Sequence, residues 1–337
     1  MKQTSAPIVK AAALVGMLCL IFDSKCAVQS ASDAIELCLT TVIPSLFPMF
    51  VLSGILTSGI RNKASMLSFL ETTLQLPTGS GSIYFIGLLG GFPVGAQSIA
   101  QSVAEKRLSK QDGERMLGYC NNCSLAFLFG IAAHLFDSLH YPLLISLIQV
   151  ESSLIVALLW AQKPNAALCI QPIAAQPPNH ISRAVKSMCA VCSWIILAGV
   201  FNGIVKRWLF PFLPAMATTI IQGMTELTSG TLNLHGIEST ALKFILCSTF
   251  VNFGGICVLL QIKSIVSAEG LSILTCMSQK SIQAVCGTLL SLSTATFGLW
   301  TLPIPVIMLF IAKNCLEKSR ETVYNSNYKG GFHHAVP

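Results

Sequence analysis

The sequence predicts an all-α membrane protein, a polytopic helix bundle of two pseudo-symmetric halves, each with a Gly-broken helix or hairpin. Hydrophobic residues make up 53% of the chain and charged residues only 10%, whereas about 25% charged residues is typical of soluble domains. The mean hydropathy is +0.68. Charge-free runs also recur along the chain, separated by short charged loops. Since a membrane-crossing helix needs about 20 apolar residues, these runs predict roughly eight to ten membrane segments, some of them half-helices or hairpins.

Composition along the chain divides it into five parts. Residues 1–30 form an N-terminal membrane segment that also fits a secretory signal peptide, because two lysines precede its apolar stretch. Residues 31–162 are expected to form the first transmembrane half. Residues 163–182 have the composition of a polar, Pro-rich linker. Residues 183–312 would form the second transmembrane half, and residues 313–337 a polar C-terminal tail.

A broken apolar stretch lies in the first half, within the charge-free run 72–104. It reads GGFPVGAQ, and in a helix interior Gly costs about 1 kcal/mol and Pro about 3 kcal/mol. Phe92 is also disfavoured in the helical conformation because Pro93 follows it. A helix break is therefore predicted here. At membrane depth such breaks are tolerated where they are buried in protein or line a wet cavity, and transporters use them as substrate sites.

The second half repeats this pattern weakly, at a shift of 164 residues. The shift pairs Gly90 with Gly254, Gly91 with Gly255, Val94 with Val258, Gln97 with Gln261, Ala104 with Ala268 and Glu105 with Glu269. Corresponding interrupted segments in two halves indicate a transporter's binding site. Basic residues crowd the loop after the first copy more than the loop after the second, where Lys280 stands nearly alone. This asymmetry favours opposite orientations for the two halves.

A polar stretch, YCNNCS, opens the apolar segment 116–136, which is expected to be one span. Paired asparagines are costly in hydrocarbon, so Asn121 and Asn122 should face the interior of the bundle. In the charged stretch before it, Ser109 is expected to cap a short helix, with Asp112 three residues further on.

The two breaks predict a substrate site, because half-helix N-termini present unpaired N–H groups and a positive dipole end. Neutral side chains around the breaks would add hydrogen-bond donors. The candidate substrate-binding residues are Gly90, Gly91, Gly95, Gln97, Ser98, Gln101, Asn121, Asn122, Ser124, Asn252, Gly254, Gly255 and Gln261. The glycines would act through the backbone alone, and the asparagines could instead join helices by hydrogen bonds worth about 0.6 kcal/mol each. Lys263 is the nearest candidate cation, although it could equally snorkel to the interface.

Three carboxylates are candidates for proton or sodium coupling: Glu226, Glu151 and Asp137. A carboxylate within a membrane indicates function. Glu226 is preferred because it precedes the Gly- and Asn-containing interval 228–233. The sequence has no Gly-Lys pair, so it contains no phosphate-binding P-loop and predicts no intrinsic ATP or GTP motor.

Catalytic residues, a metal site and cofactors are not expected. The chain lacks the G-x-S-x-G and H-E-x-x-H motifs, so the sequence does not predict an enzyme. Cys120 with Cys123 and Cys189 with Cys192 form two C-x-x-C pairs, the spacing of a four-thiolate zinc site. Both pairs lie in apolar stretches, where Cys commonly behaves as a small hydrophobic residue.

Several motifs together resemble one family. GGFPVGAQSIAQ, LSKQDGERML, GYCNNCSLAFLFG and the later NFGGICVLLQIKSI are similar to motifs of the YlbJ family of sporulation integral membrane proteins, a branch of the nucleoside-recognition or gate-domain membrane proteins. The resemblance covers roughly residues 39–312. It implies a multi-pass protein of the cytoplasmic (inner) membrane of a spore-forming bacterium, or of the mother-cell-derived outer forespore membrane. Family members often carry a basic residue where Gln97 stands here.

The resemblance also implies transport, and for the best-understood branch the solute is dipicolinic acid, moved from mother cell to forespore. The sequence therefore predicts a secondary transporter of a small organic anion or nucleoside-like solute, whose two breaks face one cavity. The alternative is a structural or morphogenetic sporulation protein without transport activity. The expected partners are the lipid bilayer, a small-molecule substrate, and a second copy of the chain or a sporulation membrane protein. No nucleic-acid partner is expected.

Overall fold

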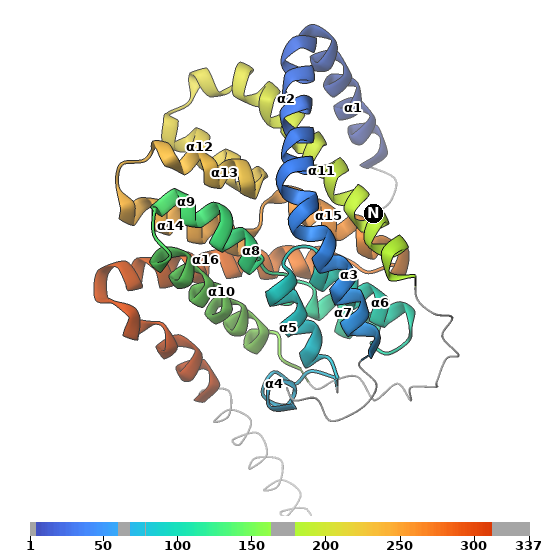
Figure 1. Cartoon of the computed structure of the whole chain (residues 1–337), viewed down its shortest axis with the longest axis vertical. Helices are drawn as coiled ribbons and strands as arrows, with labels where there is room; N and C mark the ends of the chain where they lie inside the picture. Colours follow the sequence, from blue (N-terminus) through green and yellow to red (C-terminus); the bar gives the residue numbers. More distant parts are fainter. Residues whose placement is uncertain (1–4, 60–67, 78, 163–178, 312–337) are drawn as a thin grey trace, which may run out of the picture.

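The computed structural model describes residues 5–59, 68–77, 79–162 and 179–311, and these residues form helices and loops without a strand (Figure 1). The all-α prediction is confirmed. Most of the predicted linker and nearly all of the predicted tail lie outside the described residues. Within them, the helices long and apolar enough to cross a membrane are α10 (His140–Leu159), α11 (His180–Trp208) and the segment Thr240–Glu269. A bent N-terminal pair of helices adds a fourth if it counts as one span.

The N-terminal pair consists of α1 (Ser5–Phe22) and α2 (Ser24–Leu37), which meet at a bend of 100°. Two side chains at the C-terminal end of α11 contact the residue at this bend. The carboxylate of Asp23 accepts a hydrogen bond from the Trp208 indole at 3.1 Å and pairs with the Arg207 guanidinium at 2.8 Å. Beyond the bend, α2 packs along α11 and continues through a π-helical turn into α3 (Ile43–Gly59).

The first predicted break is confirmed, between α5 (Gly81–Gly90) and α6 (Val94–Ala104). The chain turns at Gly91, whose φ of +76° favours glycine, and α5 and α6 then pack against each other. A Cβ on Gly87 would lie 3.5 Å from the Gly95 Cα, and a Cβ on either glycine would collide with the carbonyl of Cys120. These two glycines therefore let the hairpin close around a carbonyl group.

The second predicted break is also present, between α14 (Thr240–Phe253) and α15 (Ile256–Val266). Gly254 and Gly255 have φ of +84° and +88°. Here the chain does not fold back, because Thr240–Glu269 extends as one 30-residue candidate span. The half-helices α6 and α15, each 11 residues long, pack against each other. The two copies of the sequence repeat thus contact each other through α6 and α15. The chain folds back at the first break but not at the second.

A further interruption replaces the single span predicted for 116–136. Ser109 caps α7 (Lys110–Met116) by accepting the Asp112 N–H at 3.0 Å, as predicted. The chain then leaves the helical conformation over residues 117–124 before α8 (Leu125–Phe127). After a π-helical turn, α9 (Ala133–Phe136) ends the segment. The single-span prediction is wrong because the backbone of this stretch pairs with other elements, as described below.

The last described long helix, α16 (Leu274–Phe297), packs against α14 and α10. Its buried face carries Gln279, Lys280 and Gln283, each 0% exposed. These polar groups keep α16 out of the set of apolar candidate spans although it has 24 residues. The prediction that Lys280 lies in a loop after the second break is therefore wrong, and this buried lysine gives no information on the orientation of the two halves.

Candidate functional site

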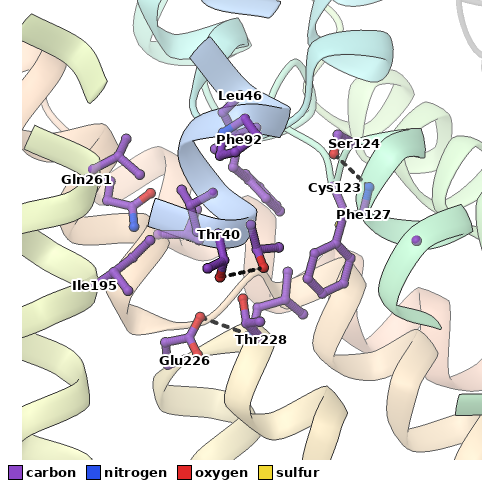
Figure 2. A pocket seen from close by; sticks show the side chains of 17 residues that line it. Thr40, Leu46, Phe92, Cys123, Ser124, Phe127, Ile195, Glu226, Thr228 and Gln261 are labelled. Atoms are coloured by element: carbon purple, nitrogen blue, oxygen red, sulfur yellow. Dashed lines mark hydrogen bonds between the residues drawn. The ribbon is translucent and has the colours of Figure 1, made fainter. Parts of the chain in front are cut away.

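A cavity of about 450 Å³ lies where the two breaks meet (Figure 2). Its described lining includes Phe92 from the first break, Ser124 from the unwound segment, Glu226 and Thr228, and Val258 and Gln261 from α15. Figure 2 shows Gln261 and Ile195 on one side, Ser124 and Phe127 on the other, and Glu226 below them. The volume is in the range of pockets that bind small molecules.

The two breaks are in direct contact beside this cavity. A Cβ on Gly254 would lie 2.7 Å from Cζ of Phe92, so the aromatic ring of the first break packs on the backbone of the second. A Cβ on Gly255 would lie 3.2 Å from the Thr225 carbonyl oxygen, next to Glu226. The first break thus lines the cavity through Phe92, whereas the second break lies behind this ring and the half-helix after it contributes Val258 and Gln261 to the lining.

Two of the predicted substrate-binding side chains line the cavity. Ser124 also accepts the Phe127 N–H at 3.1 Å, and the Gln261 amide contacts the Cys257 sulfur at 3.4 Å. The other predicted residues are not among its described lining: Gly90, Gly91, Gly95, Gln97, Ser98, Gln101, Asn121, Asn122, Asn252, Gly254 and Gly255. The glycines among them shape the breaks instead.

The three polar side chains predicted on α6 have different surroundings. Gln101 donates to the Glu105 carboxylate at 2.8 Å. Ser98 is buried, and its backbone carbonyl accepts the Ser102 hydroxyl at 2.8 Å. The Oε1 atom of Gln97 is buried and has no hydrogen-bond partner among the described residues. The structure therefore does not bring these three side chains together.

Asn121 caps the half-helix that follows the first break. Its Oδ1 accepts the Ala96 N–H at 2.8 Å, and its Nδ2 donates to the Leu117 carbonyl at 2.7 Å. The Ala96 N–H, one of the half-helix N–H groups predicted to be free for a substrate, is thus already bound by a side chain of the protein. The neighbouring Cys123 backbone exchanges two hydrogen bonds of 2.9 Å with the Gln149 side chain. These contacts explain why the stretch is not helical.

Asn122 and Asn252, from the two family-like motifs, join one buried network. The Gln283 amide donates to Asn122 Oδ1 at 2.9 Å and to Asn252 Oδ1 at 3.3 Å. Asn252 Oδ1 also accepts the Ser152 hydroxyl at 2.5 Å. The side-chain Oε1 of Gln283 accepts a hydrogen bond from the Lys280 ammonium at 2.8 Å. All five side chains are 0% exposed, so the network links α10, α14, α16 and the unwound segment.

Lys280 lies beside the cavity and was not among the predicted site residues. Its Nζ lies 4.9 Å from the centroid of the Phe92 ring, and that ring lines the cavity. The position of Gln283 could have revealed it, because Gln283 follows Lys280 by three residues and Gln279 by four, and side chains at these spacings are neighbours on a helix surface. Lys263, the cation proposed from the sequence, is exposed instead, which agrees with its snorkelling alternative.

Glu226 lies at the tip of a helical hairpin formed by α12 (Ala215–Thr225) and α13 (Leu227–Asn233). Its carboxylate accepts the N–H groups of Thr228 at 2.9 Å and Ser229 at 2.7 Å, and also the Ser229 hydroxyl at 2.7 Å. Glu226 is 6% exposed. It lines both the central cavity and a second cavity of about 320 Å³.

The other two carboxylates proposed for coupling are placed differently. Asp137 is an exposed residue at the end of α9, and Glu151 is a partly buried residue of α10. Neither is among the described residues that line the central cavity. Of the three, Glu226 alone is among the described residues that line this cavity.

Comparison with known proteins gives one informative similarity. The chain is 22% identical over 295 residues to the sporulation integral membrane protein YlbJ of Bacillus subtilis (strain 168), a match that covers 74% of this chain and 72% of that protein. No family model matches the chain, and no solved structure matches it. The similarity supports a relationship to the YlbJ family, in agreement with the motifs, and it supports a multi-pass membrane protein.

Proposed function

From this relationship to the YlbJ family, we propose that the chain is a secondary transporter that moves a small organic anion or nucleoside-like solute across a membrane. The observation that carries the proposal is the cavity lined by Phe92 of the first break, by Val258 and Gln261 of the half-helix that follows the second break, and by Glu226. Interrupted helices around a central site are how many secondary transporters hold their solutes. Dipicolinate is the first solute to test, and the membrane would be the cytoplasmic membrane or the outer forespore membrane.

We predict that the purified protein in lipid vesicles takes up labelled dipicolinate, and that Gly91→Leu and Asn122→Ala abolish this flux. A side chain at Gly91 would meet Ser124 and also require a φ of +76°. Asn122→Ala removes the oxygen that accepts from Gln283. The matched control is Gly236→Ala, because a Cβ there has nothing within 4 Å. Wild-type flux no greater than that of empty vesicles would contradict the proposal.

A structural or morphogenetic role in sporulation is the alternative, since the relative's name describes sporulation and not transport. A strain that lacks the gene separates the two roles. Full rescue of its sporulation defect by both Gly91→Leu and Asn122→Ala would favour the structural role. A transporter requires that both variants fail to rescue while they still accumulate in the membrane.

Glu226→Gln should remove ion-driven accumulation of the solute while exchange of labelled for unlabelled solute continues. The substitution keeps the size of the side chain but removes the charge that would hold a proton or sodium ion in the cavity. It also weakens the N-cap of α13, which should lower the free energy of unfolding by about 1 kcal/mol. Uptake with and without an imposed proton or sodium gradient measures the effect. Glu238→Gln, at an exposed carboxylate, is the control, and unchanged accumulation in Glu226→Gln would exclude Glu226 as the coupling group.

A further inference from the structure

Two basic side chains are buried in the described part of the chain, and only one of them has a counter-ion. Arg115 is 7% exposed and pairs with the Asp112 carboxylate at 3.0 Å. Lys280 is 0% exposed, and no ion pair of the described residues includes it. The titratable groups that interact with it are thiols, of Cys276, Cys123 and Cys120. A thiol is largely uncharged at neutral pH, so the described residues supply no anion to Lys280.

The contacts that Lys280 does make offset only part of the cost of burying its charge. One of its three N–H groups donates to the side-chain Oε1 of Gln283 at 2.8 Å. Its ammonium also lies 4.9 Å from the centroid of the Phe92 ring, within the range of a cation–π contact. Replacing buried charged groups with apolar residues of similar volume often leaves a protein equally stable or makes it more stable. Stability of the fold therefore does not by itself account for a lysine at this position.

Phe92 stands between the ammonium and the central cavity. Its ring contacts Lys280 and also lines the cavity, as the close-up in Figure 2 shows. Cys123 likewise lines the cavity and interacts with Lys280. Phe92 belongs to the first break, and its ring rests on Gly254 of the second. A relative movement of the two breaks would therefore carry this ring with it.

We propose that Lys280 is the counter-charge for a carboxylate of the transported solute, and that Phe92 covers it in the present conformation. This inference rests on the proposed transport function and narrows its solute to an anion. When the ring moves aside, a carboxylate oxygen from the cavity takes its place at the ammonium. Gln283, held by Asn122 and Asn252, fixes the position of the ammonium through its hydrogen bond. A neutral nucleoside would leave the charge uncompensated.

The test measures binding and transport separately, with dipicolinate as the anionic probe and uridine as the neutral probe. Calorimetry on the purified protein gives the dissociation constants, and vesicle uptake gives the fluxes. Lys280→Met should weaken dipicolinate binding by about tenfold or more and reduce its flux. Lys263→Met, at an exposed lysine, should leave both unchanged. Thermal unfolding shows whether each variant is folded, and Lys280→Gln replaces Lys280→Met if the latter is not.

The outcomes separate this inference from the transport proposal. Dipicolinate binding that is equally tight in wild type and in the folded Lys280 variant overturns the inference, while wild-type flux keeps the transport proposal. Lys280-dependent binding without any flux supports the anion site and overturns transport. A wild type that binds no dipicolinate, or that binds uridine alone, overturns the inference as well. Phe92→Leu should retain binding, because leucine leaves more room beside the ammonium.

Discussion

Replacing Gly95 with alanine should destabilise the protein strongly and abolish transport. The new Cβ would collide with the carbonyl oxygen of Cys120 and lie 3.0 Å from Asn121 Oδ1. Neither atom is free to move away, because the first belongs to the backbone and the second accepts the Ala96 N–H at 2.8 Å. Overpacking of a core typically costs 1–3 kcal/mol, and a clash with backbone should reach the upper end, about 3 kcal/mol.

Thermal unfolding in detergent, followed by the loss of the monodisperse peak on size exclusion, measures this effect. Gly87→Ala should behave in the same way, because a Cβ there meets the same carbonyl from α5. Gly236→Ala is the control, with nothing within 4 Å of the added Cβ. If Gly95→Ala unfolded at the same temperature as Gly236→Ala, the hairpin would not close around Cys120 as described.

The breaks that the sequence predicted are those whose causes are local. The first break follows from the chemistry of glycine and proline at 90–95, and the second from the pair Gly254 and Gly255. Both would disrupt a helix in any context. The cap of α7 was predictable for the same reason, because Ser109 and Asp112 are three residues apart. Local chemistry therefore determines where these helices begin and end.

The features that were missed depend on contacts between distant segments. Residues 117–124 leave the helix because Asn121 caps α6 and Gln149 pairs with the Cys123 backbone. Nothing in YCNNCS itself identifies either partner. Lys280 was placed in a loop because a lone lysine between apolar runs normally marks one. Its buried ammonium contacts Phe92, which lies far away in the sequence, and no local pattern shows that contact.

A second large effect is expected for Gln283→Leu. This substitution removes the oxygen that accepts from Lys280 at 2.8 Å and the amide that donates to Asn122 at 2.9 Å. The buried ammonium would lose its hydrogen-bond acceptor, and a hydrogen bond to a charged group typically contributes about 1.5–3 kcal/mol. Denaturant unfolding of the detergent-solubilised protein measures the loss. Gln101→Leu, which breaks a partly exposed hydrogen bond to Glu105, should cost less than about 1 kcal/mol.

The double variant Lys280→Met with Gln283→Leu should recover much of that stability, because the charge is removed together with its acceptor. Residues in one hydrogen-bond network commonly couple by 0.5–3 kcal/mol, and we expect about 2 kcal/mol or more here. Additive losses would mean that the two side chains do not share a network. Recovery of stability without recovery of dipicolinate binding would separate the two roles of Lys280. The fold would then tolerate loss of the charge while the solute site would not, which is the behaviour expected if the ammonium serves the solute.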